Sequence, residues 1–260
     1  MVRNSMARDC RNGTALIAVL LACTQPGGPL AGAEADRATI HVSATAAAGG
    51  DGTAGRPLAS LAEALAEHTR PGTIIAIDAQ GGPLVEDVAV GNLRGEAGKP
   101  ITIRSSGRRG AVLRGRLRVR GAAHLVLQRL AVEPKPGDGS PEPLVTVEGD
   151  GVEVRDCRIT GAPGDGLRLA GKAIVVGGGQ VAACEGWGVV TEGAARVDGL
   201  RVVSCRKGGL RVRGEALVSN CLLLHNRGPA IEAQKGAAVR FYHNLVYDNG
   251  GGPMLGDCNA

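Results

Sequence analysis

Glycine recurs at a nearly constant interval through the second half of the chain. Gly149, Gly171, Gly193, Gly214 and Gly236 lie 22, 22, 21 and 22 residues apart. A fixed period of this length is typical of repeat proteins, in which each repeat buries its apolar face only by stacking on its neighbours. The sequence therefore predicts a solenoid over this part of the chain.

Each of these glycines follows a short segment in which apolar and polar residues alternate. Such alternation indicates a strand with one face towards a core and the other towards water. Aligned by the repeat, the inward positions form two columns: Leu117, Val145, Leu167, Val189, Leu210 and Ile231, then Val119, Val147, Leu169, Thr191, Val212 and Ala233. A second strand after each glycine gives a further column: Val132, Ile159, Val181, Val202, Leu223 and Val246. We expect two strands and a tight corner in each coil.

The corners distinguish the repeat classes that have similar periods. Leucine-rich repeats need a leucine and asparagine core pattern with a helix or loop behind it, whereas these corners are rich in glycine and have no helical period. Ankyrin and tetratricopeptide units are longer and helical, and six-residue repeats do not fit spacings of 21 or 22 residues. The remaining fold class is all-β, a right-handed parallel β-helix with strands about 4.8 Å apart.

The composition fits one domain with a narrow core. The chain has 260 residues, of which 43% are hydrophobic, yet it contains only one Trp, two Tyr and one Phe. The formal net charge of +5 weakly favours anionic partners, and a solvated surface explains it equally well. No segment resembles a nucleic-acid-binding motif, so we expect no nucleic-acid partner.

The first 33 residues are predicted to be an export segment. An arginine-containing start precedes the apolar run Ala15–Ala22, which is too short to span a bilayer. Ala31-Gly32-Ala33 has the small-x-small pattern of a cleavage site, while "LLAC" ending at Cys23 resembles the lipobox of bacterial lipoproteins. Either interpretation predicts an exported protein, extracellular, periplasmic or on the cell surface. A lipid anchor on Cys23 would be its contact with a membrane.

The rest of the chain divides into three segments. Residues 34–56 form a polar, glycine-rich lead-in, and residues 57–69 are predicted to be a capping helix. Ser60 and Glu63 have capping-box spacing, and the apolar stripe beginning at Leu61 would cover the open end of a solenoid. Residues 70–260 are then the parallel β-helix. Its last coil shows no helix or polar cap, so we expect end-to-end self-association or a further segment.

The order of segments from residue 40 onward resembles the pectate-lyase-like right-handed β-helix proteins. The matching motifs are D-G-T at 51–53, L-x-x-A-L at 61–65, P-G-T-I at 71–74, E-D-V at 86–88, I-T-I-R at 101–104 and N-L-V-Y-D-N at 244–249. The resemblance covers nearly all of residues 40–255 and implies the β-helix with its capping helix. The superfamily includes polysaccharide lyases, epimerases and glycoside hydrolases, but also surface proteins without known chemistry, so the fold does not decide the function.

The sequence departs from the enzymatic members in its carboxylates. Calcium-dependent lyases of this fold gather several carboxylates on one face, and hydrolases need two or three aspartates on neighbouring coils. Here Asp156 and Asp198 are two coils apart, roughly 10 Å by the strand spacing, and no third carboxylate joins them. Calcium is therefore not supported, we predict no cofactor or metal, and catalytic residues stay unassigned.

Arginines provide the candidate binding residues. Arg118, Arg168 and Arg211 share one outward column, and Arg213 lies in the next. Arg168 and Arg211 are two coils, roughly 10 Å, apart, which is about a disaccharide repeat, and a guanidinium can bind a uronate carboxylate through two hydrogen bonds. In the alternative interpretation, these arginines pair with glutamates of the same face: Glu148, Glu192 and Glu232.

Two residues at the corners are further binding candidates. Lys207 could act as a substrate clamp or base. Trp187, in the corner "CEGWGV", could stack on a sugar ring or pack against the neighbouring corner.

One corner column combines cysteines and asparagines. Cys184, Cys205, Asn226 and Asn249 are 21, 21 and 23 residues apart, so stacking brings neighbours to about 5 Å. This pattern predicts an internal ladder of small polar side chains. Cys184 and Cys205 are near disulfide distance in an oxidising compartment, and free buried thiols are the alternative that we favour.

Two functional hypotheses follow. In the first, the chain is an exported β-helix that binds a polysaccharide, acidic by the arginine row, or serves as a structural surface protein. In the second, it is a lyase-like carbohydrate-active enzyme with Arg168, Arg211 or Lys207 as clamp or base.

Overall fold

The computed structural model describes residues 38–107, 110–251 and 254–255. These ranges contain one helix, α1 (Leu61–Glu67), which lies between the first two strands. The earlier strands are β1 (Thr39–Val42), β2 (Ile74–Ile77), β3 (Leu84–Val85), β4 (Val88–Gly91), β5 (Ile101–Ser105), β6 (Ala111–Arg114), β7 (Leu117–Ala123), β8 (Leu125–Gln128) and β9 (Leu130–Glu133). The later strands are β10 (Val145–Asp150), β11 (Glu153–Arg155), β12 (Arg158–Thr160), β13 (Leu167–Gly177), β14 (Gln180–Ala182), β15 (Trp187–Asp198), β16 (Arg201–Val203), β17 (Gly208–Ser219), β18 (Leu222–Leu224), β19 (Ile231–Ala233), β20 (Ala238–Tyr242), β21 (Leu245–Tyr247) and β22 (Met254–Leu255).

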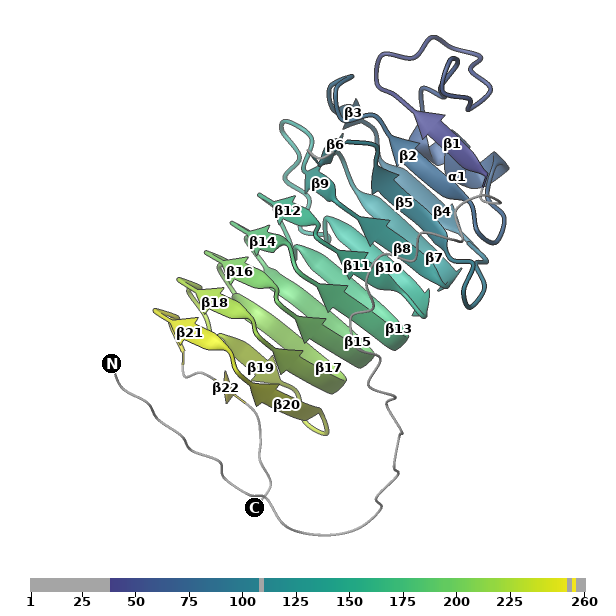
Figure 1. Cartoon of the computed structure of the whole chain (residues 1–260). Helices are drawn as coiled ribbons and strands as arrows, with labels where there is room; N and C mark the ends of the chain where they lie inside the picture. Colours follow the sequence, from purple (N-terminus) through teal and green to yellow (C-terminus); the bar gives the residue numbers. More distant parts are fainter. Residues whose placement is uncertain (1–37, 108–109, 252–253, 256–260) are drawn as a thin grey trace. The chain divides into compact units, whose positions relative to one another are not determined.

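The strands stack in parallel into three faces of one solenoid (Figure 1). The first face consists of β4, β7, β10, the starts of β13, β15 and β17, and then β19 and β22. The second face consists of β1, β2, β5, β8, β11, the ends of β13, β15 and β17, and then β20. The third face consists of β3, β6, β9, β12, β14, β16, β18 and β21.

Three strand segments in each coil correct the expectation of two. The missed division is a corner of one left-handed residue between the second and third faces. The residues of this corner have φ between 52° and 67°: Arg129, Asp156, Gly178, Gly199, Asn220 and His243. Gly, Asn, Asp and His tolerate this conformation best. Because the corner takes a single residue, it shifts the apolar alternation by one position between the second and third faces.

The predicted apolar columns of the first face are confirmed. Val145 pairs in register with Leu167, Leu167 with Val189, and Val189 with Leu210. These four side chains are at most 1% exposed. Identical positions of successive coils therefore stack on one another, and the core is a continuous row of aliphatic side chains along the solenoid.

The predicted polar ladder is also present. Asn226 Oδ1 accepts a hydrogen bond from the Cys205 backbone N–H at 2.9 Å, and Asn226 Nδ2 donates to Asn249 Oδ1 at 2.8 Å. Cys184 and Cys205 are buried free thiols. The hydrogen bond to Cys205 and burial raise the pKa of the Cys184 thiol. The backbone N–H of Cys205 is buried at this corner, where the chain is not in a strand. The Asn226 side chain supplies the hydrogen bond that this group needs.

The helix α1 packs against β1, β2 and β4 with Leu61, Ala64 and Leu65 buried. Ser60 Oγ accepts from the Glu63 backbone N–H at 3.2 Å, as the capping-box spacing predicts. A distant carboxylate completes the cap, because Glu86 accepts from the Leu61 backbone N–H at 2.6 Å and from Ser60 Oγ at 2.8 Å.

Two further findings concern the segment before α1 and membrane-spanning helices. The stretch expected to be a polar lead-in contributes β1, which pairs with β2 in the second face. In the ranges that the structure describes, no helix has the length and apolar character needed to cross a membrane.

Candidate functional site

A groove of about 580 Å³ lies over the first face. Its floor is made of outward-facing residues of β7, β10, β13 and β15, and its wall is the loop of residues 134–143 between β9 and β10. The lining residues are Arg118, Arg120, Glu142, Pro143, Thr146, Glu148, Arg168, Ala170, Gly171 and Glu192. Because most of them are charged or polar, the groove suits a ligand that forms many hydrogen bonds.

In-register pairing arranges the floor in two columns. Arg118, Thr146 and Arg168 form one column. Glu148, Ala170 and Glu192 form the other. Coils about 4.8 Å apart give the floor a length of roughly 14 Å along the solenoid.

Among the described residues of the floor, Glu192 forms the most ion pairs. Its Oε1 accepts from Arg168 Nη2 at 2.6 Å and from Arg213 Nη1 at 2.7 Å, so one carboxylate bridges the arginines of the preceding and following coils. Arg211 beyond the groove pairs similarly with Glu232, at 2.8 Å. The sheet therefore presents a network of alternating charges.

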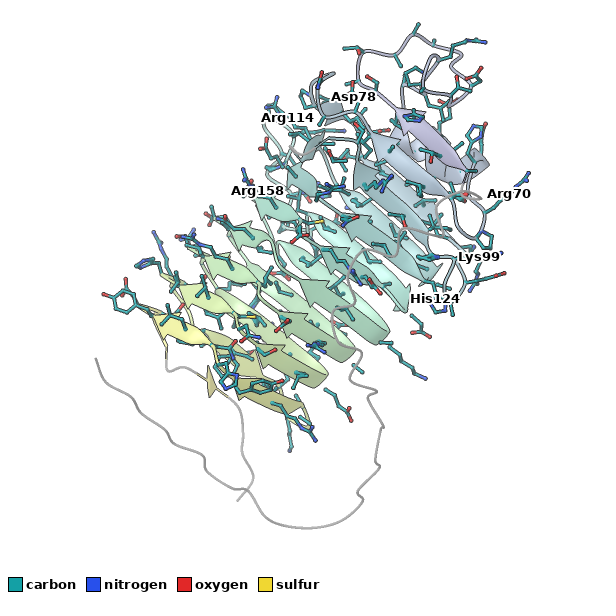
Figure 2. All side chains as sticks on the ribbon, viewed as in Figure 1. Arg70, Asp78, Lys99, Arg114, His124 and Arg158 are labelled. Carbon is teal, nitrogen blue, oxygen red and sulfur yellow. The ribbon has the colours of Figure 1, made fainter. Side chains whose placement is uncertain are left out.

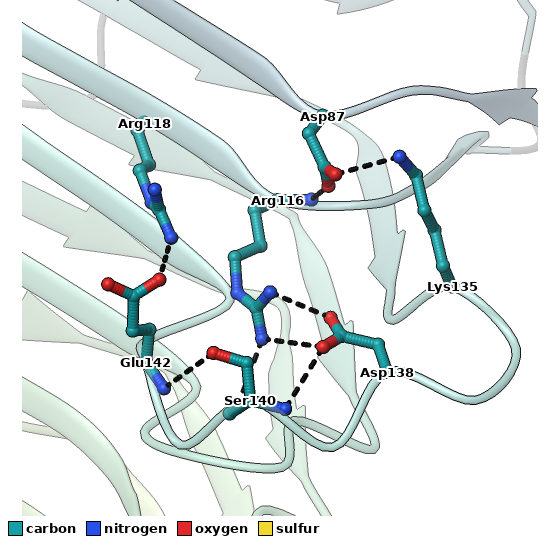
Figure 3. Close-up of polar contacts among 7 residues, drawn as sticks. All are labelled: Asp87, Arg116, Arg118, Lys135, Asp138, Ser140 and Glu142. Carbon is teal, nitrogen blue, oxygen red and sulfur yellow. Dashed lines mark hydrogen bonds and ion pairs between the residues drawn. The ribbon is translucent and has the colours of Figure 1, made fainter.

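The wall is fixed by ion pairs to residues that directly precede β4 and β7 of the first face (Figure 3). Arg116 forms a buried pair with Asp138 at 2.9 Å and donates to the Ser140 carbonyl at 3.0 Å. At the start of the loop, Lys135 Nζ lies 2.7 Å from a carboxylate oxygen of Asp87. Hydrogen bonds from Lys135 and from the Arg116 backbone N–H lower the pKa of the Asp87 carboxyl. The loop is thus held in place at both its beginning and its middle.

At the far end of the wall, Glu142 pairs with Arg118 of the floor. The groove is therefore lined by as many glutamates as arginines: Arg118, Arg120, Arg168, Glu142, Glu148 and Glu192. In the described part of the chain, Arg120 and Glu148 are the lining residues whose charges have no ion-pair partner. The two unpaired charges are of opposite sign, so the lining is electrically balanced.

The comparisons with known proteins agree with this architecture. A model of the family described as "Right handed beta helix region" matches residues 143–259. This chain folds as a right-handed parallel β-helix. No curated protein sequence matches it.

Two solved structures share the β-helix at low sequence identity. A GH136 lacto-N-biosidase from Eubacterium ramulus has a TM-score of 0.58 at 13% identity, with 79% of this chain and 55% of that chain covered. An alginate lyase from Paenibacillus sp. str. FPU-7 has a TM-score of 0.53 at 14% identity, with 86% and 99% covered. This β-helix thus spans about half of the lacto-N-biosidase and nearly all of the alginate lyase. At such identities the likeness concerns the fold.

The β-helix brings the predicted binding residues together only in part. Arg118 and Arg168 line the groove, whereas Arg211 and Arg213 continue the same face on the next coil. Lys207 lies exposed in the turn before β17, outside the groove lining.

Of the two alternatives for Trp187, stacking on a sugar or packing within the protein, the structure shows packing. Its side chain is 5% exposed, and the Arg211 guanidinium lies over its ring at 5.3 Å from the centroid. In this arrangement no face of the indole is presented to a sugar.

Sequence reasoning missed the wall of the groove. Glu142 and Pro143 belong to a loop without a counterpart in the other coils, so no column contains them. The available signal was the interval from Leu117 to Val145, which is 28 residues instead of 21 or 22. An insertion of this kind marks the coil at which a solenoid carries an added surface.

The two aspartates weighed as a catalytic pair lie away from the groove. Asp198, at the end of β15 on the second face, accepts from Ser219 Oγ at 2.7 Å and Asn220 Nδ2 at 2.8 Å, and these bonds lower the pKa of its carboxyl. Asp156 is a left-handed corner residue. Across the described ranges, no group of three or more His, Cys, Asp and Glu side chains is placed to hold a metal ion.

Proposed function

We propose that this β-helix binds a polysaccharide in the groove over β7, β10, β13 and β15. The observation that carries the proposal is the polar lining of the groove between a flat sheet and an ion-paired wall. Extended polymers fit a groove that runs along stacked coils, because successive sugars can contact the side chains of successive coils.

The chemistry of the lining supports a sugar ligand. Guanidinium groups offer several N–H donors, carboxylates offer several acceptor sites, and the Thr146 hydroxyl offers both. Two coil steps of roughly 10 Å match a disaccharide repeat. The two solved structures with the same fold carry the names of enzymes that act on carbohydrates, a lacto-N-biosidase and an alginate lyase.

Affinity electrophoresis in gels that contain polysaccharides tests the proposal. We expect the wild type to be retarded by at least one polymer, and the double variant Arg118→Ala/Arg168→Ala to be retarded less. A matched control removes two arginines of the third face, Arg158 and Arg201, which lie far from the lining residues along the coil (Figure 2 labels Arg158). No retardation of the wild type, or equal losses in both double variants, would contradict binding in the groove.

The alternative function, polysaccharide cleavage by a lyase, is examined with the same polymers. Elimination produces an unsaturated sugar that absorbs ultraviolet light. Accumulation of that product with the wild type, and its loss in Arg168→Ala, would make the groove an active site rather than a binding surface.

We also propose that the protein is exported. Residues 1–33, which carry the candidate signal and Cys23, lie outside the described residues. Incorporation of labelled palmitate in a bacterial host, abolished by Cys23→Ala, is expected for the lipoprotein. A secreted, unlabelled chain that begins at Glu34 is expected for cleavage after Ala33, and a chain retained inside the cell would contradict both.

A further inference from the structure

We infer that the groove accepts an uncharged, hydroxyl-rich glycan rather than a polyuronate. The inference rests on the proposed function, since it names the class of polysaccharide that the groove would bind. It starts from the charges of the lining, which the side-chain contacts show to be largely neutralised within the protein.

The arginines that would grip a uronate are already occupied by glutamates. Arg168 donates to Glu192 at 2.6 Å, and Glu192 also holds Arg213 at 2.7 Å. Arg118 is paired with Glu142 of the wall. A ligand carboxylate could reach these guanidinium groups only by displacing a protein carboxylate or by lying beside it, and like charges in close contact disfavour binding.

A repeating anion would meet the same obstacle at each coil. Among the residues described, Arg120 is the one arginine of the lining without a carboxylate partner. The unpaired Glu148 lies one coil away, on β10. One free cation cannot compensate a chain with a charge on every sugar when three glutamates line the same groove.

A neutral sugar finds complementary partners at the same positions. The hydrogen bonds from Arg168 and Arg213 to Glu192 both end on Oε1. Oε2 can therefore accept a hydrogen bond from a sugar hydroxyl. Each paired guanidinium retains further N–H donors, and Arg120 and Glu148 add one donor group and one acceptor group. Ala170 between the charged residues has a short side chain, which lets a sugar ring approach the sheet.

The two ligand classes differ in their response to salt. Binding through ionic contacts weakens steeply as ionic strength rises, whereas hydrogen bonding to a neutral sugar does not. Retardation is therefore measured in gels with neutral β-glucan, galactan or xylan and with alginate or polygalacturonate, at low and at high salt. We expect retardation by at least one neutral polymer, unchanged by salt, and none by the polyuronates.

The failures of the two proposals are distinguishable. Salt-sensitive retardation by a polyuronate with none by neutral polymers would overturn the inference and leave the proposed function standing. No retardation by any polymer of either class would overturn both.

A charge variant tests directly whether the pairing of arginines with glutamates keeps polyuronates out of the groove. Glu192→Gln keeps the shape of the side chain but releases the charges of Arg168 and Arg213, so it should show a salt-sensitive retardation by alginate that the wild type lacks. The matched control is Glu185→Gln, which breaks the exposed 2.7 Å pair with Arg206 away from the groove. Absence of a gain in Glu192→Gln, or an equal gain in both variants, would contradict the inference.

Discussion

At the scale of single residues, Thr191 is the polar member of an inward column of the first face that is otherwise aliphatic in the described coils. It occupies an inward column between Leu169 and Val212. Its side chain is 1% exposed, and its Oγ1 has no hydrogen-bond partner in the part of the chain that the structure describes. A buried hydroxyl without a partner costs about 1–3 kcal/mol.

Replacement of this hydroxyl by a methyl group should stabilise the protein. We expect Thr191→Val to raise the free energy of unfolding by about 1 kcal/mol, because valine keeps the β-branched shape and removes the unsatisfied group. Urea unfolding followed by circular dichroism measures the change. The control is Thr160→Val on the third face, a half-buried position, where little change is expected. A Thr191→Val protein that is no more stable than the wild type would contradict the prediction.

At the scale of elements, contacts between segments distant in the sequence position the loop of residues 134–143. Lys135 and Asp87 are 48 positions apart, and Arg116 and Asp138 are 22 apart. The Arg116 and Asp138 side chains are only 10% and 15% exposed, so each depends on the other for its neutralisation. Besides the pair of Glu142 with Arg118, the wall of the groove therefore depends on two ion pairs at the beginning and middle of the loop, one exposed and one buried.

The exposed pair predicts a pH dependence of the wall. Because the folded-state pKa of Asp87 lies below its ordinary value of 3.8, the pair stabilises the loop above that pH and is lost as the pH falls through the folded-state pKa. In Lys135→Ala, the pKa of Asp87 should rise towards the ordinary value, since the hydrogen bond from Lys135 is the largest cause of the shift. Carboxyl NMR titration measures it, and Glu185→Gln is the control. An unchanged titration of Asp87 in Lys135→Ala would contradict this assignment.

At the scale of the whole β-helix, its two ends differ. The helix α1 packs against β1, β2 and β4 at one end. At the other end, β20 pairs with β17 and β21 pairs with β18, and neither has a second partner strand in the described ranges. Leu245 and Tyr247 of β21 are 57% and 64% exposed. An unpaired edge with exposed apolar side chains favours pairing with another chain.

We therefore expect end-to-end self-association. Sedimentation velocity over a range of concentrations should show a species of twice the monomer mass at high concentration. The variant Leu245→Lys/Tyr247→Lys should lower its proportion, because charged side chains on an edge strand oppose pairing. A control with Arg158→Lys/Arg201→Lys, on earlier coils of the third face, should associate like the wild type. A strictly monomeric wild-type protein would contradict the prediction.

The sequence by itself determined the repeat, the inward columns, the capping helix and the ladder that includes Asn226. These features follow the period: residues 21 or 22 positions apart become neighbours on successive coils, so alignment of the sequence places them in space. Alternation reveals which positions face the core, since one face of each strand is buried. The row of Arg118, Arg168 and Arg211 was predictable for the same reason.

Only the tertiary structure showed which charges surround that row of arginines. The loop of residues 134–143 has no periodic counterpart, so its place over the first face is fixed by contacts of Lys135 and Asp138 with residues that no repeat relates to them. The columns brought Glu192 near two arginines, but whether its carboxylate pairs with both depends on side-chain geometry rather than on register. The burial of Trp187 likewise depends on how one corner packs on the next. Periodicity specifies neighbours along the solenoid, whereas the charge balance of a surface is set by contacts between side chains.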